Sequence, residues 1–222
     1  MSRAKRLLVI NPNSSAAVSQ RLADVADIVL TGRAVVQVVT AAGGPAYLGD
    51  METMRAGEAA AIAAVRDLCI GQGKAFDAIV MGCFAELGVA AVRQMLEIPV
   101  CSLLGASLLA AGRRGRRLGI VTAGTQWRDL LPSMVAPLLR NDEMVLAGIR
   151  TIDTTGTIIA EQPDLAIQAL NRAVWECRHH DGADVVVIGG AGLGGLAARL
   201  NVPADTAVID SVEAGLIQSL GD

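Results

Sequence analysis

The chain has 222 residues, of which 52% are hydrophobic and 18% are charged. This composition excludes a disordered chain, and the length suffices for one large domain or two small ones. Aromatic residues make up only 2% and the net charge is −3, so nothing indicates a nucleic-acid surface. The apolar runs at 7–10 and 102–112 are too short for a signal peptide or a membrane span, so we expect a soluble cytoplasmic protein.

Short apolar runs alternate along the chain with amphipathic stretches. The runs predict buried strands at residues 7–10, 35–39, 78–81, 118–121, 185–188 and 206–209. The stretches predict helices at residues 16–26, 53–70, 87–96, 125–139, 165–179 and 193–200. Such alternation is typical of an α/β fold in which helices cover parallel sheets.

The two halves of the chain repeat one another. Segments 5–14 and 116–125 each contain two basic residues, a strand and a polar turn, and segments 77–85 and 184–192 each contain Asp, four apolar residues and a glycine turn. The repeat predicts two pseudo-symmetric parallel-sheet α/β lobes. We assign residues 1–100 with 209–222 to the first lobe and 101–208 to the second, and we expect the last strand and the tail helix to return to the first lobe. Ligands bind at the carboxyl ends of parallel strands, so the site is expected in the cleft between the lobes.

Cys83 is the main candidate for chemistry because it directly follows a predicted strand and precedes a predicted helix. A thiol at a helix N-terminus is expected to have a lowered pKa, and Gly82 keeps the chain beside the thiol uncrowded. The alternative is a buried structural cysteine. We expect Cys69, Cys101 and Cys177 to be core or surface cysteines without a chemical role. No cysteine pair has the spacing of a metal site, so no metal is predicted.

Polar turns follow the first strand of each half and are candidate substrate-binding segments. Asn11, Asn13 and Ser14 belong to the first turn, and Thr122 and Thr125 belong to the second. Amide side chains and free backbone N–H groups at the start of a helix suit a carboxylate or an imide, and simple helix capping is the alternative.

The glycine-rich segment that opens with Gly190, Ala191 and Gly192 fits the dinucleotide pattern G-x-G-x-x-G, with Asp210 about 20 residues further on. We set this interpretation aside because the helix that follows is very short and only twelve residues follow Asp210. The repeat also explains the strand and the turn without a nucleotide. The three residues are instead expected to line the cleft, with Glu213 as a candidate acid near it.

Seven segments, taken in order, resemble the hydantoin and allantoin racemases of the aspartate/glutamate/hydantoin racemase superfamily. They are Asn-Pro-Asn-Ser at 11–14, Gly-Cys-Phe-Ala-Glu-Leu-Gly at 82–88, 98–100, 106–107, 120–122 with Trp127, 189–193 and 208–212. The resemblance implies an isomerase that needs neither cofactor nor metal and acts on a small carboxylate or cyclic amide. Two thiols would face a carbon next to a carbonyl from opposite sides, and Phe84 would lie against the substrate. A homo-oligomer would be ordinary.

The sequence departs from the family pattern at two positions. Cys83 matches the first thiol, but Gly190 stands where the second is expected, and Gly105 stands where the family has a glutamate. The resemblance still favours a racemase or epimerase with Cys83 as thiolate base, with Glu213, a threonine hydroxyl or a water serving the other face. Two alternatives stay open. Cys83 works alone, in a decarboxylase or as a nucleophile that isomerises an alkene or opens a ring, or the protein is a non-catalytic ligand binder.

Overall fold

The computed structural model describes residues 3–139, 144–154, 159 and 162–221. The strands are β1 (Lys5–Asn11), β2 (Ala34–Thr40), β3 (Ala78–Met81), β4 (Val100–Ser102), β5 (Arg117–Ala123), β6 (Val145–Ile152), β7 (Val185–Gly189) and β8 (Ala207–Asp210). The helices are α1 (Ala16–Val29), α2 (Met51–Val65), α3 (Val89–Met95), α4 (Leu103–Gly112), α5 (Trp127–Val135), α7 (Pro163–His179) and α8 (Ser211–Ser219). Short π or 3-10 segments lie at η1 (Arg66–Gly71), η2 (Ala136–Leu138), η3 (Ala191–Leu193) and η4 (Ala197–Arg199).

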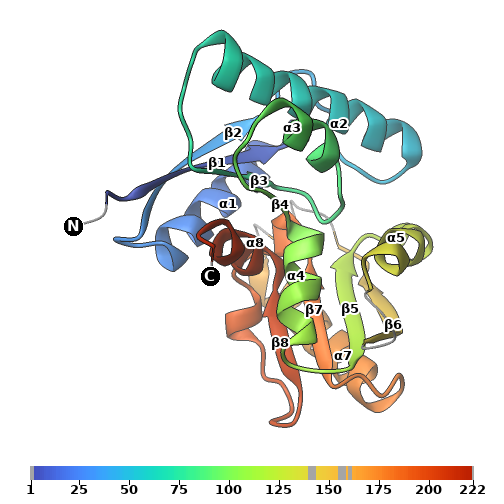
Figure 1. Cartoon of the computed structure of the whole chain (residues 1–222). Helices are drawn as coiled ribbons and strands as arrows, with labels where there is room; N and C mark the ends of the chain where they lie inside the picture. The colour runs from blue at the N-terminus through green and yellow to red at the C-terminus, as the bar shows by residue number, and fades with distance from the viewer. Residues whose placement is uncertain (1–2, 140–143, 155–158, 160–161, 222) are drawn as a thin grey trace.

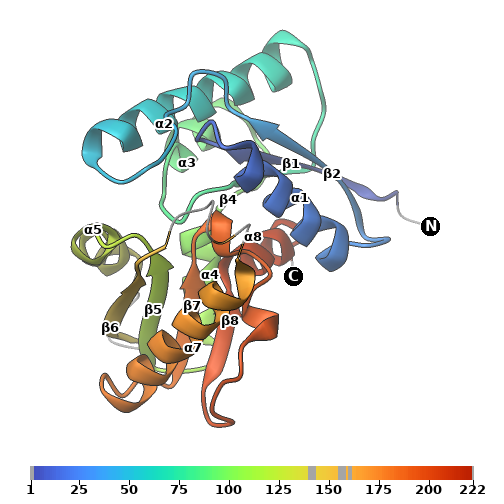
Figure 2. The same cartoon turned by 180° about the vertical axis from the view of Figure 1, so that it is seen from behind.

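Two four-stranded parallel sheets form two lobes, as the repeat predicts. The strand order is β2-β1-β3-β4 in the first sheet and β6-β5-β7-β8 in the second, so the two sheets have the same topology. Figure 1 shows the first lobe above the second, and Figure 2 shows the same arrangement from behind. The middle parts of the central strands are buried because their residues, such as Leu7–Ile10, are apolar on both faces.

Helices α4 and α8 lie between the lobes. They pack against each other, and each contacts strands of both sheets. This position explains why the segment 103–112 is largely apolar, because most of its side chains are covered; Leu109, which is 47% exposed, is an exception. A single apolar cluster consequently extends through both lobes and includes Leu103 and Leu104 of α4 and Leu216 of α8.

The lobe boundary differs from the expected one. Strand β8 pairs in parallel with β7, so the expectation that the last strand returns to the first lobe is wrong. Strand β4 belongs to the first sheet, which places the crossing after Ser102 and not after residue 100. The tail helix α8 contacts both lobes. Two strands were not predicted from the sequence. Strand β4 has only three residues, which is too short for a recognisable pattern, and the residues of β6 are mostly half buried and include Gly148 and Arg150.

Two of the helices predicted from the sequence also differ from those in the structure. The stretch 193–200 contains two 3-10 turns and no α-helix, because Gly194 and Gly195 interrupt it and Gly195 has a φ of 77°. The stretch 53–70 begins earlier, at Met51, and changes to a π-helix at Arg66. None of the helices in the described part of the chain is long and apolar enough to cross a membrane.

Candidate functional site

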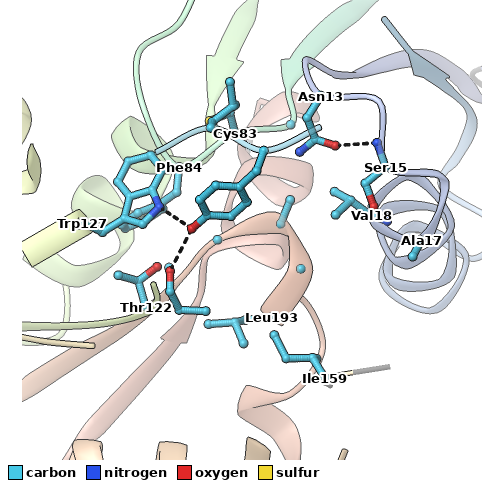
Figure 3. Close-up of a pocket in the computed structure, with 18 of the residues that line it drawn as sticks. Asn13, Ser15, Ala17, Val18, Cys83, Phe84, Thr122, Trp127, Ile159 and Leu193 are labelled. Carbon is cyan, nitrogen blue, oxygen red and sulfur yellow. Dashed lines mark hydrogen bonds between the residues drawn. The ribbon is translucent and has the colours of Figure 1, made fainter. Parts of the chain in front are cut away.

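A cavity of about 410 Å³ opens between the lobes at the carboxyl ends of the central strands (Figure 3). It is lined by Asn13, Ser15, Ala17, Val18, Ala46, Tyr47, Leu48, Gly82, Cys83, Phe84, Thr122, Ala123, Trp127, Thr154, Ile159, Gly189, Gly190, Ala191, Gly192 and Leu193. This is the location that parallel α/β topology assigns to ligands, and the volume lies within the ordinary range for small-molecule sites.

A tight turn after β3 presents the Cys83 thiol to the cavity. The Gly82 N–H donates to the Ile10 carbonyl at 2.7 Å, and the Cys83 N–H donates to the Met81 carbonyl at 2.8 Å. A Cβ on Gly82 would lie 2.8 Å from that same Ile10 oxygen, so only glycine allows the chain to pass so close to β1.

The electrostatic setting of Cys83 contradicts the expected lowering of its pKa. Helix α3 begins only at Val89, so the thiol is not at a helix N-terminus. Its side chain is buried, and this burial raises the pKa of Cys83 to about 12, an effect that the Phe84 N–H opposes only in part. The resting thiol is therefore protonated at neutral pH, and its thiolate is a stronger base than that of an ordinary cysteine.

Gly190 occupies the position equivalent to Cys83 in the second lobe. Met81, the last residue of β3, pairs with Ile10, and Ile188, the next-to-last residue of β7, pairs with Val121. Cys83 and Gly190 each lie two residues further along the chain, so the two positions match across the repeat. Among the described residues other than its chain neighbours, a Cβ built on Gly190 would have only Thr122 Oγ1 within 4 Å, at 3.6 Å. The φ of Gly190 is 119°, a conformation that L side chains rarely adopt. The second thiol position is thus open space in this chain.

The two asparagine side chains of the Asn-Pro-Asn turn have different roles. Asn11 is fully buried; its Nδ2 donates to the Ser15 carbonyl and to Ser19 Oγ, both at 3.0 Å, while its Oδ1 accepts from the Asn13 N–H. Asn13 Oδ1 accepts from the Ser15 N–H at 2.9 Å, which fixes the amide orientation and leaves Nδ2 turned toward the cavity (Figure 3). Asn11 shapes the turn, and Asn13 lines the cavity.

Tyr47 is a lining residue that the sequence did not single out. It belongs to the loop before α2 in the first lobe, but its hydroxyl reaches the second lobe. The Trp127 Nε1–H donates to Tyr47 Oη at 3.0 Å, and Tyr47 Oη donates to the Ala123 carbonyl at 3.4 Å. Burial is the main cause of a raised Tyr47 pKa, and a thiolate at Cys83 raises it further. Its only sequence signal is that it is the single tyrosine of the chain.

The side chains that line the cavity, among the residues that the structure describes, carry no charge. Phe84, Trp127 and Leu193 contribute apolar walls. Thr122 is 4% exposed and its hydroxyl has no hydrogen-bond partner among the described residues, and neither has the buried Thr154 Oγ1. The described part of the chain also contains no cluster of His, Cys, Asp or Glu that could hold a metal ion.

The predicted site residues fall into two groups. Those that line the cavity are Asn13, Gly82, Cys83, Phe84, Thr122, Gly190, Ala191 and Gly192. Those that do not are Asn11, Ser14, Thr125 and Glu213. Glu213 lies in the first turn of α8 and is not among the residues that line the cavity.

Asp210 has a structural task that accounts for its place after the glycine-rich segment. Its Oδ1 accepts from the Val212 N–H at 2.9 Å at the start of α8, and its Oδ2 accepts from the Gly195 N–H at 2.7 Å. The carboxylate therefore pins the turn that follows Gly190 to α8, and it is not free to bind a ribose.

Comparison with known proteins places these features in context. Residues 7–218 match the sequence model of the family described as Asp/Glu/Hydantoin racemase. The chain is 28% identical over 211 residues to a hydantoin racemase of Paenarthrobacter aurescens, covering 94% of this chain and 87% of that protein. It is 26% identical over 208 residues to a hydantoin racemase of Rhizobium meliloti, covering 94% and 84%. The structure of an allantoin racemase from Klebsiella pneumoniae superimposes with a TM-score of 0.87 at 22% identity, covering 97% of this chain and 86% of the other, so it shares the fold.

Proposed function

The chain belongs to the Asp/Glu/hydantoin racemase family, and from that premise we propose that it is a cofactor-independent racemase or epimerase acting on a small hydantoin-like cyclic amide. The reacting atom is the carbon next to a ring carbonyl, and Cys83 is the thiolate base. The observation that carries this proposal is a buried thiol in a cavity whose described lining residues are all uncharged.

The absence of charge among these lining residues favours a neutral substrate. An amino-acid zwitterion or a dicarboxylate would lose its water in the cavity without meeting an opposite charge, which is strongly unfavourable. A hydantoin ring is neutral and requires only hydrogen bonds. The aromatic and aliphatic walls formed by Phe84, Trp127 and Leu193 favour an apolar substituent on the reacting carbon over a ureido group such as that of allantoin.

Three neutral groups with unused hydrogen-bonding capacity support ring binding. Asn13 Nδ2 can donate, and the hydroxyls of Thr122 and Thr154 can donate or accept. A hydantoin ring offers two carbonyl oxygens and two N–H groups. A donor placed at the carbonyl beside the reacting carbon would also stabilise the enolate that forms when the proton leaves.

The raised pKa of Cys83 makes its thiolate a strong base, but only a small fraction of the thiol is ionised at neutral pH. The proton on a carbon beside a carbonyl is only weakly acidic, so a thiolate whose pKa is near 12 accepts it more favourably than an ordinary thiolate would. The carbonyl stores the charge, so Cys83 has only to move a proton on its own side of the ring. Inversion requires a second acid on the opposite side, since Gly190 has no proton to give.

A single-thiol reaction is the second candidate, favoured by the open space at Gly190. Cys83 would then protonate one face only, after decarboxylation or exchange, or would act as a nucleophile. The uncharged lining weighs against a malonate as substrate, because a malonate carries two carboxylates.

The test is proton NMR in D2O on single-enantiomer 5-benzylhydantoin, allantoin, glutamate and phenylmalonate. We expect loss of the α-proton signal for the hydantoin and normal exchange in Cys101→Ala. In Cys83→Ala this loss should be absent for the enantiomer whose α-proton faces Cys83. Cys101 is a matched control because it is as buried as Cys83, on a strand of the same sheet, but does not line the cavity. Exchange of glutamate in preference to hydantoin, decarboxylation of the malonate, or binding of the hydantoin without exchange would overturn the proposal.

A further inference from the structure

We propose that the Tyr47 hydroxyl donates the proton to the face of the substrate opposite Cys83. The inference rests on the proposed function and names the group that replaces the missing second thiol. It follows from where the fold places this hydroxyl and from the hydrogen bonds that hold it there.

The two proton-carrying groups reach the cavity from different sides. Cys83 lies at the end of β3 in the first lobe, whereas Tyr47 Oη is held at the end of β5 in the second, by Trp127 and Ala123. Figure 3 shows Cys83 and Thr122 on opposite sides of the cavity, with the Trp127 indole beside Thr122. A planar enolate bound between the two lobes would therefore present one face to the thiol and the other to the phenol.

The hydroxyl is held at the strand end that flanks the position of the second thiol, more than 4 Å from a Cβ built on Gly190. Thr122 pairs with Gly189 across the sheet, and its Oγ1 would be 3.6 Å from a Cβ on Gly190. Ala123, which accepts the hydrogen bond from Tyr47, is the next residue on the same strand. Tyr47 thus brings a proton from the first lobe to the strand end that flanks the open space at Gly190.

The hydrogen bonds of Tyr47 suit a group that releases a proton. An indole N–H can only donate, so the bond from Trp127 Nε1 at 3.0 Å stabilises the phenolate that remains. The bond from Tyr47 Oη to Ala123 is long at 3.4 Å, so the proton is held weakly. The neighbouring Thr122 hydroxyl is a much weaker acid than a phenol, and Glu213 does not line the cavity.

The proton balance closes over one inversion. The buried Cys83 thiol first releases its proton to solvent. The resulting thiolate removes the α-proton and becomes a thiol again, and the electron pair of the broken C–H bond moves into the ring carbonyl. The pair then returns to the carbon as this carbon takes the proton of Tyr47 on the other face, which leaves a phenolate. The reverse reaction starts from the phenolate as base and the thiol as acid. A thiolate at Cys83 raises the pKa of Tyr47, so the phenol stays protonated while the thiolate is the base.

The experiment follows both enantiomers of 5-benzylhydantoin in D2O by proton NMR and by chiral chromatography, with an enzyme-free blank. In Tyr47→Phe we expect inversion to fall at least about 100-fold, the scale of general acid catalysis. One enantiomer should still exchange its α-proton through Cys83, with retention of configuration, and the other should not exchange. In Cys83→Ala the enantiomer that exchanges in Tyr47→Phe should no longer exchange, and the other enantiomer should exchange with retention of configuration. Trp175→Phe, an exposed aromatic substitution outside the cavity, should invert both enantiomers at the wild-type rate.

Three results would overturn the inference. Inversion by Tyr47→Phe within about threefold of the wild-type rate would exclude Tyr47 while leaving the proposed function intact. Loss of exchange of both enantiomers in a Tyr47→Phe protein with an unchanged unfolding temperature would show that the hydroxyl does not serve one face. Wild-type protein that exchanges neither enantiomer would overturn the proposed function itself, and this inference with it.

Discussion

The contact between Gly189 and Phe84 closes the two lobes over the thiol, and it provides a sharp test of the geometry. Gly189 ends β7 in the second lobe, and Phe84 follows Cys83 in the first. A Cβ on Gly189 would lie 2.6 Å from both Cδ1 and Cζ of the Phe84 ring and closer still to Cε1. We therefore predict that Gly189→Ala forces the ring, and with it the Cys83 turn, out of place.

The magnitude follows from how little room the ring has. Phe84 is only 3% exposed, so the ring cannot swing into solvent without leaving its packing. Overpacking of this kind costs about 1–3 kcal/mol, and three contacts below the normal limit place Gly189→Ala at about 2–3 kcal/mol. For a chain of this length that lowers the unfolding temperature by about 5–10 °C. Displacement of the neighbouring thiol should lower the racemisation rate at least about tenfold.

Thermal unfolding by circular dichroism measures the first effect, and polarimetry with a single-enantiomer hydantoin measures the second. Gly192→Ala is the matched control for stability, because a Cβ there meets no atom of the described residues within 4 Å and the φ is not positive. Its unfolding free energy should stay within about 0.5 kcal/mol of wild type. A Gly189→Ala protein as stable as the control would refute the interlobe contact.

Three further predictions concern the thiol, the pinned turn and the binding hydroxyl. Because burial raises the pKa of Cys83 to about 12, its thiolate fraction grows tenfold per pH unit well beyond pH 9. The rate of Cys83 alkylation by iodoacetamide, followed by peptide mass spectrometry, should therefore rise without a plateau from pH 7 to 10. A plateau near pH 8.5 would contradict the raised pKa. Asp210→Ala removes the cap of α8 and the partner of the Gly195 N–H, so urea unfolding should show a loss of about 2 kcal/mol, and a loss below about 0.5 kcal/mol would exclude the pinning role. Thr122→Val keeps the side-chain shape but removes a hydroxyl from a residue that lines the cavity. Steady-state kinetics should show a KM raised about tenfold, and an unchanged KM would show that the Thr122 hydroxyl does not bind the substrate.

The sequence was sufficient to predict the features that depend on local residue patterns and on the internal repeat. The apolar runs at 7–10 and 185–188 could only be strands buried on both faces, and the repeat correctly placed Cys83 and Gly190 at equivalent turns. Cytoplasmic location and homo-oligomeric assembly stay predictions.

The other features of the site depend on how the folded chain brings distant segments together, which the sequence pattern does not show. Tyr47 sits in a loop without periodicity, and only the closure of the lobes brings its hydroxyl to Trp127. The expected lowering of the Cys83 pKa was wrong because the turn before α3 buries the thiol before any helix begins. Residue spacing alone does not reveal how deeply a thiol is buried.

The most direct test of the account is the optical rotation of a single enantiomer of 5-benzylhydantoin over time, with wild-type protein, Cys83→Ala and Cys101→Ala at equal concentration. We expect the rotation to decay to zero with wild type and Cys101→Ala, and to decay only at the rate of the enzyme-free blank with Cys83→Ala. Rotation that decays equally with Cys83→Ala, or that stays constant with wild type, would contradict the claim that Cys83 is the base of a racemase.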